Sequence, residues 1–376
     1  LQAQALIVDR AAAPAAVAAA TKLGISVLSL EALQGETEAP GEAAPSQPDD
    51  IALVLHTSGT TSRPKIVPLT QRNLALSAQN IARSLQLERE DRCLNIMPLF
   101  HVHGLIGAVL SSLTAGASVV CTPGFAAVHF FQWLEEFAPT WYTGVPTMHQ
   151  AVVAAAGSNG SSAPRSRLRF IRSCSSALPP TLMAELEKTM GAPVVEAFGM
   201  TEAAHQAACN PLPPRARKPG SVGVATGTEI TVLDAAPPGA DGFAIGEIAL
   251  KGAGITRGYE SPPEANATAF TDGWFRTGDQ GHIDSDGYVF LTGRIKELIN
   301  RGGEKIAPRE IDEALLAHPA VAQAVAFAVP HPTLGEDVAA AVVLRSGATA
   351  DPEEIRASTF ERLAAFKAPS MVVVVD

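Results

Sequence analysis

Short apolar runs alternate with longer amphipathic stretches through the first half of the chain. Apolar runs typical of strands occupy residues 3–8, 25–30, 51–55, 91–97, 118–122, 141–145, 168–173 and 193–196. Stretches with helical spacing lie between them, at residues 71–85, 129–137, 146–155 and 181–190, and an Ala-rich helix follows the first run. The continuous apolar run at 51–55 predicts a buried strand. The alternation as a whole predicts an α/β domain whose helices flank a mostly parallel sheet.

The texture changes in the second half of the chain. Residues 220–290 carry short strand-like runs separated by Gly and Pro turns, which predicts a small β subdomain. A compact α+β region follows, with a helix at 308–316 and strands at 321–329 and 338–344. The Pro-, Ala- and acid-rich segment 34–50 is typical of a linker or mobile loop. We therefore predict an N-terminal domain over 1–294 and a C-terminal domain over 295–376.

Composition and charge narrow the class of protein. The chain has 376 residues, a hydrophobic fraction of 47% and a net charge of −10, so it lacks the basic footprint of a nucleic-acid-binding protein. Its four cysteines are far apart without a CxxC pair, which argues against a zinc site and for a reducing compartment such as the cytoplasm. The uncharged run 105–121 is interrupted by polar and Gly residues, so we predict a helix, a turn and a strand rather than a membrane span. Oligomeric state leaves no mark in the sequence.

A hydroxyl-rich loop at residues 57–65 is the first candidate for chemistry. It has the sequence TSGTTSRPK and follows the apolar run 51–55. Hydroxyl groups, a Gly that lets the backbone approach and a Lys point charge can wrap a polyphosphate. The spacing differs from that of a Walker A loop, which excludes a P-loop NTPase. The candidate phosphate-binding residues are Thr57, Ser58, Gly59, Thr60, Thr61 and Lys65.

Five further segments carry a family resemblance. They are 99–104 (LFHVHG), 196–202 (EAFGMTE), 246–259 (GEIALKGAGITRGY), 274–279 (WFRTGD) and 293–306 (GRIKELINRGGEKI). Together with the hydroxyl-rich loop, these segments resemble those of the adenylate-forming acyl-CoA synthetases, the AMP-binding or ANL superfamily. The resemblance implies a large N-terminal domain, a small mobile C-terminal domain, and the use of ATP, Mg²⁺ and coenzyme A to turn an acid into its thioester.

The resemblance also implies roles at the nucleotide. Glu202 would bind Mg²⁺ and Thr201 the α-phosphate, which suits the charge that builds up on phosphate oxygens during adenylation. Phe198 would stack on adenine, where the family usually has Tyr. Asp279 would hold the ribose hydroxyls together with Arg294. The remaining residues expected around AMP are Ser176, Ala177, Glu196 and Ala197.

A second set of residues is implied for thioester formation. In the family the C-terminal domain rotates between the two half-reactions, and Lys296 matches the hinge. Gly302, Gly303, Glu304 and Lys305 match the loop that lines the pantetheine tunnel after rotation. A plain hairpin turn would explain the Gly pair but not the whole 293–306 string.

The segments expected at the acyl pocket are polar, which bears on the substrate. His101, His103, residues 173–176 and His205 favour a short, charged acid over a fatty acid. A hydrogen bond to a charged group is worth about 1.5–3 kcal/mol, so two such contacts discriminate by roughly two to four decades. Segments 168–178, 200–213, 218–223 and 294–305 resemble the oxalate–CoA ligase (oxalyl-CoA synthetase, or peroxisomal-CoA-synthetase-like) branch. In that branch His101, Ser175 and His205 would hold the distal carboxylate of oxalate.

Two alternatives stay open. A short- or medium-chain acyl-CoA synthetase would use the same machinery on a monocarboxylate. The other alternative is a catalytically incomplete nucleotide-binding fragment. The family continues past the position of Asp376 to a segment with a catalytic lysine, and it has further residues before the segment that matches 34–50. We expect such a fragment to adenylate poorly. A peroxisomal address would also lie beyond Asp376, so the cytoplasm is predicted with the peroxisome open.

Overall fold

The computed structural model describes residues 3–9, 14–33, 45–57, 64–158, 167–238, 242–345 and 347–375. Contacts divide the chain into two compact units, residues 1–47 and 48–376, and each is described by itself. The boundary predicted between residues 294 and 295 stays a prediction. Residues 34–44 of the predicted linker lie outside the described residues.

The first unit is a small αβ arrangement. Strand β1 (Ala5–Val8) pairs in parallel with β2 (Ser26–Ser29), and helix α1 (Pro14–Lys22) connects them. Helix α2 (Leu30–Leu33) follows directly. The strand, helix and strand predicted for residues 3–30 are therefore present.

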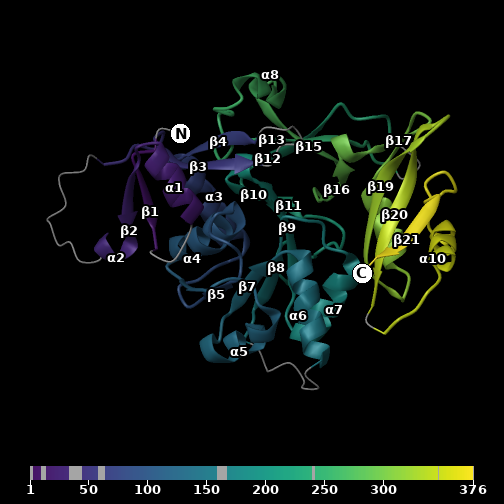
Figure 1. Cartoon of the computed structure of the whole chain (residues 1–376), viewed down its shortest axis with the longest axis horizontal. Coiled ribbons are helices and arrows are strands. Elements are labelled where there is room, and N and C mark those ends of the chain that lie inside the picture. The colour runs from purple at the N-terminus through teal and green to yellow at the C-terminus, as the bar shows by residue number, and fades with distance from the viewer. Residues whose placement is uncertain are drawn as a thin grey trace. The chain divides into compact units, whose positions relative to one another are not determined.

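The second unit contains a seven-stranded sheet within the described residues, in the order β11-β10-β9-β8-β7-β5-β6 (Figure 1). Its parallel strands are β5 (Arg92–Asn95), β6 (Ser118–Cys121), β7 (Trp141–Gly144), β8 (Phe170–Ser173) and β9 (Val194–Met200). Strands β10 (His205–Cys209) and β11 (Val224–Ala225) extend one edge in antiparallel fashion. The accompanying helices are α3 (Gln71–Ser84), α5 (Ala127–Phe137), α6 (Pro146–Ser158) and α7 (Pro180–Met190). This confirms the predicted α/β class with a mostly parallel sheet.

The uncharged run 105–121 forms a helix, a turn and strand β6, as predicted. The helix begins with a π-helical segment, η1 (His103–Leu110), and continues as α4 (Ser111–Thr114). A π-helical turn is rare and tends to occur at functional sites. None of the helices in the described part of the chain combines the length and apolar character needed to cross a membrane.

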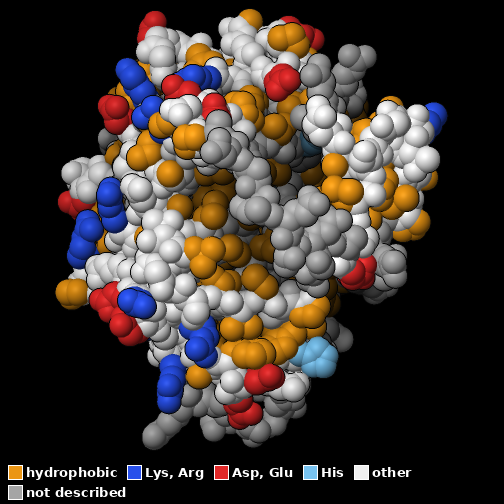
Figure 2. Space-filling model, turned by 90° about the vertical axis from the view of Figure 1, so that its left-hand side faces the viewer, with side chains coloured by type: hydrophobic (Ala, Val, Ile, Leu, Met, Phe, Trp, Pro, Cys, Tyr) orange, Lys and Arg blue, Asp and Glu red, His pale blue; other side chains and the backbone are white. Residues whose placement is uncertain are grey.

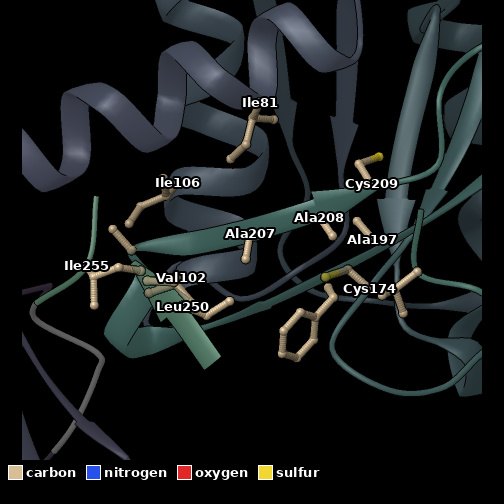
Figure 3. Close-up of a cluster of buried hydrophobic side chains, with 14 of the residues drawn as sticks. Ile81, Val102, Ile106, Cys174, Ala197, Ala207, Ala208, Cys209, Leu250 and Ile255 are labelled. Atoms are coloured by element: carbon tan, nitrogen blue, oxygen red, sulfur yellow. The ribbon is translucent and has the colours of Figure 1, made fainter. Parts of the chain in front are cut away.

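The main hydrophobic core joins the large sheet to the region that follows it. Figure 3 shows Ile81 of α3, Ile106 of η1, Ala207 and Ala208 of β10, and Leu250 among its members. The small side chains of β10 let the surrounding elements approach closely, which buries apolar surface from segments far apart in sequence. Of the four free cysteines, three are buried and Cys121 is exposed.

An antiparallel β subdomain follows the large sheet, as predicted. It contains β12 (Glu229–Leu233), β13 (Gly246–Lys251), β14 (Phe270–Thr271), β15 (Trp274–Ile283) and β16 (Val289–Arg294). The short helices η3 (Pro263–Ala265) and α8 (Asn266–Ala269) lie between β13 and β14. Strand β15 is central, because it pairs with β13, β14 and β16.

The predicted burial of the strand at 51–55 was wrong. Strand β3 (Ile51–Thr57) forms an antiparallel two-stranded sheet with β4 (Lys65–Thr70), and Ile51 is 54% exposed. An apolar run alone does not say how much of a strand its neighbours cover. The hairpin nevertheless carries Thr57 and Lys65 to opposite positions at its end, where they form a cross-strand pair.

The C-terminal region has its own core. Its sheet runs β18-β17-β20-β19, with β21 parallel to β20. The elements are η4 (Ile295–Glu297), β17 (Ile299–Arg301), β18 (Glu304–Ile306), α9 (Pro308–Leu316), β19 (Val321–His331), β20 (Gly335–Leu344), α10 (Pro352–Ser358), η5 (Thr359–Glu361) and β21 (Met371–Val375). Ile299, Ile311, Leu315 and Val338 are buried within it. The helix predicted at 308–316 and the strands predicted on either side of residue 333 are confirmed.

Charged side chains of both signs lie interspersed on the face shown in Figure 2, among the residues that are described there. A mixed surface of this kind has no strong preference for ligands of one sign. Charged groups interact more strongly in the interior, where solvent screens them less.

Candidate active site

A cavity of about 530 Å³ opens among the β3–β4 hairpin, the turn after β9, the β subdomain and η4. Such a volume suits a small-molecule ligand. Of the residues predicted from the sequence, those on its wall are Thr57, Lys65, His101, Ser175, Thr201, Glu202, His205, Arg294 and Lys296. Residues that are more than 200 positions apart in sequence thus share one cavity.

A tight turn between β9 and β10 delivers three of these residues. Thr201 and Glu202 lie in the 3₁₀ turn η2 (Thr201–Ala203), and His205 begins β10 with a φ of 104°. A Cβ atom on Gly199 would lie 1.5 Å from the carbonyl oxygen of His205, so only glycine fits there. This explains the glycine of the EAFGMTE segment.

The end of the cavity at the β3–β4 hairpin brings opposite charges together. The buried Glu202 accepts a hydrogen bond of 2.7 Å from the hydroxyl of Tyr259 at Oε1. The Nζ of Lys65 lies 4.2 Å from the centroid of the Tyr259 ring. Burial lowers the pKa of Lys65, and the nearby Glu202 carboxylate opposes that shift. Lys65, Tyr259 and Glu202 therefore form one electrostatic unit.

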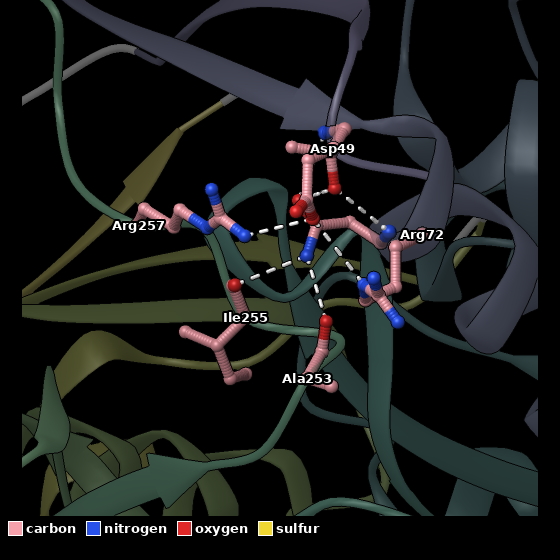
Figure 4. A network of polar contacts seen from close by, with 7 residues as sticks. Asp49, Arg72, Ala253, Ile255 and Arg257 are labelled. Atoms are coloured by element: carbon pink, nitrogen blue, oxygen red, sulfur yellow. Dashed lines mark hydrogen bonds and ion pairs between the residues drawn. The ribbon is translucent and has the colours of Figure 1, made fainter. Parts of the chain in front are cut away.

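Polar contacts hold the loop before Tyr259 against the start of α3, and Figure 4 labels Asp49, Arg72, Ala253, Ile255 and Arg257 among them. The Nδ2 of Asn73 donates to the carbonyl oxygens of Ala253 at 2.8 Å and Ile255 at 3.1 Å. On the surface, Asp49 accepts hydrogen bonds from Arg257 at 2.8 Å and Arg72 at 3.4 Å. These contacts fix the loop after β13 against the start of α3.

The same loop also contacts the turn after β9 directly. The backbone N–H of Thr256 donates to the carbonyl oxygen of Glu202 at 2.7 Å, and its hydroxyl donates to that of Pro68 at 2.8 Å. Glu202 is therefore held through both its backbone and its side chain.

Asp279 and Arg294 lie opposite each other on β15 and β16. Their side chains form an ion pair with 2.8 Å between Nε and Oδ1. Asp279 is 5% exposed, and its Oδ2 has no hydrogen-bond partner among the described residues. Burial raises the pKa of Asp279 to about 6, although Arg294 opposes the shift. Arg294 is on the cavity wall and the buried Asp279 is not, so ribose binding by Asp279 stays a prediction.

A fully buried arginine lies behind His205, at the end of the cavity away from the hairpin, and is not itself on the cavity wall. Arg172 of β8 is 0% exposed, and its Nη2 contacts His205 Nε2 at 3.0 Å and Gln206 Oε1 at 2.9 Å. Its Nη1 donates to Thr143 Oγ1 at 3.3 Å. None of these partners is acidic. Because a buried charge without an opposite charge is costly, the site favours an incoming anion.

Two histidines lie beside this arginine. The rings of His103 and His205 stack with centroids 5.1 Å apart. Burial, reinforced by Arg172, holds the pKa of both histidines well below the ordinary range, so both are neutral near pH 7. His103 contacts Ser175 Oγ at 3.0 Å and Thr143 Oγ1 at 2.6 Å.

Backbone strain marks the same end of the cavity. Ser175 has a φ of 74° and His205 a φ of 104°, values that residues other than glycine seldom adopt. Such conformations persist only where the surroundings impose them, and they cluster at ligand sites. Both strained residues line the cavity. The strain therefore supports a ligand-binding role for this end.

Gly107 of the π-helical segment makes room for His205. A Cβ atom at this position would lie 2.5 Å from His205 Nε2 and 3.5 Å from Arg172 Nη1. The helix can therefore approach the imidazole only through a residue without a side chain.

The two histidines of the LFHVHG segment have different positions. His101 is exposed on the cavity wall, and its Nδ1 accepts a hydrogen bond of 3.1 Å from the backbone N–H of His103. His103 is buried in the network with Thr143 and Ser175. Substrate contact by His101 remains a prediction.

Several residues predicted to contact AMP are not on this cavity wall. Ala197 and Phe198 are buried in the main core, with Phe198 7% exposed, so stacking of Phe198 on adenine stays a prediction. Glu196 is buried; its Oε1 accepts a hydrogen bond from the Leu178 N–H at 2.9 Å, and burial raises its pKa to about 7.

Ser176 is exposed, and Ala177 lines a separate crevice of about 500 Å³. Ser58, Gly59, Thr60 and Thr61 lie outside the described residues.

The predicted thiolation loop forms a β-hairpin. Gly302 and Gly303 make its turn with φ values of 61° and 98°, and Glu304 and Lys305 pair with Arg301 and Asn300. These residues are not on the wall of the cavity, so a role in lining a pantetheine tunnel stays a prediction.

The donor set bears on the predicted metal. Within the described ranges, no group of three or more His, Cys, Asp or Glu residues could hold a metal ion. Mg²⁺ commonly uses one or two protein carboxylates together with water and substrate phosphates. Glu202, on the same cavity wall as Thr57 and Lys65, fits that requirement.

Sequence reasoning missed several residues of the site. These are Gly107, Thr143, Arg172 and Tyr259, together with the buried position of His103. One signal was present: Arg172 directly follows the apolar pair Phe170 and Ile171 in a predicted strand, where arginine is rarely buried without a partner. Its partners Thr143 and His205 come from other strands and could not be paired from sequence alone.

Comparisons with known proteins are consistent with this geometry. Residues 1–260 match the family "AMP-binding enzyme" and residues 310–376 match "AMP-binding enzyme C-terminal domain". The chain is 49% identical to an oxalate–CoA ligase of Arabidopsis thaliana, over 88% of this chain and 65% of that protein. It is 46% identical to an oxalate–CoA ligase of Saccharomyces cerevisiae, over 90% of this chain and 61% of that protein. The chain thus spans less than two thirds of these relatives.

Solved structures share the fold. MatB from Rhodopseudomonas palustris with bound ATP matches with a TM-score of 0.87 and 31% identity, over 99% of this chain and 75% of that one. An o-succinylbenzoate-CoA synthetase (MenE) from Bacillus subtilis, in complex with ATP and magnesium, matches with a TM-score of 0.83 and 28% identity, over 99% of this chain and 75% of that one. The chain belongs to the AMP-binding enzyme family.

Proposed function

We propose that this AMP-binding enzyme is an ATP-dependent acid–CoA ligase whose substrate is oxalate. The products would be oxalyl-CoA, AMP and diphosphate. The observation that carries the proposal is the fully buried Arg172, whose hydrogen-bond partners among the described side chains are all neutral. It lies behind His205, at the end of the cavity that we propose holds the acid and call the acyl end. A second carboxylate on the substrate supplies the missing negative charge.

The first half-reaction is adenylation. A carboxylate oxygen of the acid attacks the α-phosphorus of ATP, a new P–O bond forms, and diphosphate leaves. Lys65 and Thr57 would bind the polyphosphate and Thr201 the α-phosphate, a role supported by the position of all three on one cavity wall with Glu202. Glu202 would hold Mg²⁺, which when bound neutralises charge on the phosphate oxygens. Asp279 and Arg294 would hold the ribose.

The second half-reaction is thioester formation. The sulfur of coenzyme A attacks the acyl carbon of the adenylate, the C–O bond to phosphate breaks, AMP leaves, and the thiol proton passes to solvent. We assign Lys296 to the hinge between the two arrangements, and Gly302, Gly303, Glu304 and Lys305 to the pantetheine side. This assignment rests on the family resemblance and on the position of Lys296 at the edge of the cavity.

The names of the relatives support an acid with a second negative group. Besides the two oxalate–CoA ligases, the chain is 43% identical to a sulfoacetate–CoA ligase of Cupriavidus necator, over 91% of this chain and 66% of that protein. Oxalate and sulfoacetate share an anionic group close to the carboxylate that is activated. A long-chain-fatty-acid–CoA ligase of Bacillus subtilis is 35% identical, over 85% of this chain and 57% of that protein.

The test is CoA-dependent release of AMP and diphosphate, with oxalate, malonate, acetate, hexanoate and oleate at equal concentration. We expect oxalate to lead acetate by roughly two to four decades, the value of two hydrogen bonds to a charged group. His205→Ala should remove that lead. The matched control is His129→Ala, which alters an exposed histidine on α5. A lead for hexanoate or oleate would overturn the choice of substrate while leaving the ligase chemistry in place.

The compartment is a smaller part of the proposal. All four cysteines are free thiols, which supports a reducing compartment, and we propose the cytoplasm. Fractionation of cells that produce the protein tests this, because recovery with peroxisomes would contradict it.

A further inference from the structure

The polar network at the acyl end begins at a group that can only donate hydrogen bonds. A guanidinium has five N–H donors and no acceptor, and it stays charged in proteins. Arg172 is fully buried and contacts three neutral side chains, Thr143, His205 and Gln206. Each of these atoms must therefore accept a hydrogen bond from it, and this fixes where their own protons lie.

The first branch runs through His205. Nη2 of Arg172 lies 3.0 Å from Nε2 of His205, so Nε2 must be the acceptor. A neutral imidazole that accepts at Nε2 carries its proton on Nδ1. The low pKa of His205 agrees with a neutral ring. His205 lines the cavity, so it presents Nδ1–H as a donor to a ligand.

The second branch runs through Thr143 and His103. Thr143 Oγ1 accepts from Arg172 at 3.3 Å and contacts His103 Nε2 at 2.6 Å. If His103 donated here, the Thr143 proton would be buried without an acceptor, at the cost of a lost hydrogen bond. Thr143 therefore donates to Nε2, and the proton of His103 lies on Nδ1. That proton is donated to Ser175 Oγ at 3.0 Å, which leaves the hydroxyl hydrogen of Ser175 to face the cavity it lines.

We propose that Arg172 determines acyl specificity by orienting both branches, so that His205 Nδ1–H and Ser175 Oγ–H are donors toward the ligand and the site selects a carboxylate over an amide. Thr143 and His103 are positioning residues that transmit this polarity to Ser175. This proposal rests on the proposed acid–CoA ligase function and refines it to one property of the second group on the acid: it must accept hydrogen bonds and donate none.

Oxamate is the discriminating ligand. It matches oxalate in size and in one carboxylate, but an amide replaces the second carboxylate. An amide NH₂ placed against donor groups loses hydrogen bonds, and a neutral group does not compensate the guanidinium. Oxalate presents only acceptor atoms to the same groups.

The first test uses ¹⁵N NMR of protein labelled at histidine, because protonated and unprotonated ring nitrogens have distinct shifts. His103→Gln and His205→Gln assign the resonances. We expect the Nδ1–H tautomer for both rings in the free protein. The Nε2–H tautomer at His205 would overturn the proposal whatever acid the enzyme uses.

The second test is a conservative pair at Thr143. Thr143→Val keeps the shape and removes the hydroxyl, whereas Thr143→Ser restores it. Calorimetry with AMP present measures the affinities for oxalate and oxamate. In Thr143→Val the ratio of the oxalate affinity to the oxamate affinity should fall roughly tenfold, the equivalent of one hydrogen bond. Thr143→Ser should keep the ratio, and the His103 tautomer should change only in Thr143→Val. An unchanged ratio in Thr143→Val would overturn the relay.

Arg172→Met gives the largest expected change, because it removes the origin of both branches. The ratio of the oxalate affinity to the oxamate affinity should fall by more than about a hundredfold, which corresponds to the loss of two such hydrogen bonds. If that variant does not fold, the NMR test and the Thr143 pair still decide. The proposed function can fail separately. If the tautomers and the ratio of affinities were as predicted but the enzyme did not turn over oxalate, oxalate would be refuted as the substrate and the donor polarity would stand.

Discussion

The two ends of the cavity differ in how their charged side chains are paired. The nucleotide end is the hairpin end, which we propose holds ATP, and the acyl end is the end with Ser175 and His205, which we propose holds the acid. At the nucleotide end, Lys65 lies over Tyr259, which donates to Glu202, and Arg294 pairs with Asp279. At the acyl end, Arg172 is fully buried and its partners among the described side chains are all neutral. The nucleotide end is balanced without a ligand, whereas the acyl end carries an uncompensated positive charge.

The difference indicates where selectivity for the acid arises. A buried charge without a counter-charge costs several kcal/mol, so a ligand that supplies the opposite charge gains what the empty site loses. A balanced nucleotide end gains less from any single charge and instead positions phosphate and ribose. Acid selectivity and nucleotide binding should therefore respond to different substitutions.

The strongest way to separate the two ends is Glu202→Gln. The change keeps the shape of the side chain and removes the negative charge expected to hold Mg²⁺. We expect diphosphate release to fall by about 10²–10³-fold, the usual effect of losing one electrostatic stabiliser. The preference for oxalate over acetate, from the residual rates, should stay unchanged.

The matched variant Tyr259→Phe keeps the ring beneath Lys65 and removes only the hydrogen bond to Glu202. Its rate should fall by about tenfold, in line with one hydrogen bond. If either variant also abolished the acid preference, the division into two ends would be mistaken.

Gly107→Ala should affect the acyl end alone. The new Cβ atom would lie 2.5 Å from His205 Nε2, so the ring must shift and its 3.0 Å contact with Arg172 is lost. We expect the preference for oxalate to fall by about tenfold, with AMP affinity unchanged. Substrate competition assays and calorimetry measure the two quantities.

Gly254→Ala is the control for that substitution, since a Cβ atom there meets no atom within 4 Å. It should leave the acid preference intact. A loss of AMP affinity in Gly107→Ala would show that the ends are coupled.

The pH dependence of AMP binding tests the nucleotide end. Burial raises the pKa of Asp279 to about 6, and the ribose hydroxyls should donate to its ionised form. AMP affinity should therefore be full above that pH and fall as the pH drops through it, by up to about tenfold per pH unit. Calorimetry across this range provides the measurement.

Asp279→Asn should bind AMP more weakly and without this pH dependence, which separates Asp279 from Glu196, another buried carboxyl with a raised pKa. For the free protein the sign is opposite. Folding raises the pKa of Asp279 from its ordinary value of about 4 to about 6. As the pH rises from about 4 to about 6, Asp279 therefore lowers the free energy of unfolding. A stability difference between wild type and Asp279→Asn that did not change over this window would contradict the assignment.

The smallest effect concerns the surface support of the nucleotide end. Arg257→Gln removes an exposed ion pair with Asp49, and we expect a loss of about 0.2–1 kcal/mol in the free energy of unfolding. Asn73→Ala removes buried hydrogen bonds to Ala253 and Ile255 and should cost about 1–3 kcal/mol. Denaturant titration measures both. Equal losses would mean that the surface pair contributes as much as the buried amide.

The sequence predicted the order of elements well because their periodicity is local. The helix at 308–316 coincides with α9, and five predicted strands correspond to the parallel part of the large sheet. The burial of β3 was missed because burial depends on what packs over a strand, which an apolar run does not encode. Strand β9 also runs further than 193–196, to Met200, since pairing with β10 continues it through Gly199.

The candidate site was predictable where a motif carries it. Thr201 and Glu202 lie in one motif and Lys65 in another, and the structure brings all three to one cavity. Arg172, Thr143 and His103 come from β8, β7 and the start of η1, and their relation appears only when the strands are paired. The strain at Ser175 and His205 was likewise invisible, because backbone dihedrals follow from the surrounding packing.

The neutral surroundings of Arg172 have a consequence for the chemistry of oxalate in solution. Oxalate is a chelator, and dissolved divalent cations compete for the same oxygen atoms that a donor-lined site would bind. No acidic side chain is among the described contacts of Arg172, so this end offers no carboxylate ligand to a cation carried in by the acid. Under the proposed function, the concentration that matters to the enzyme is then that of unchelated oxalate, which free Ca²⁺ and Mg²⁺ in the compartment would set.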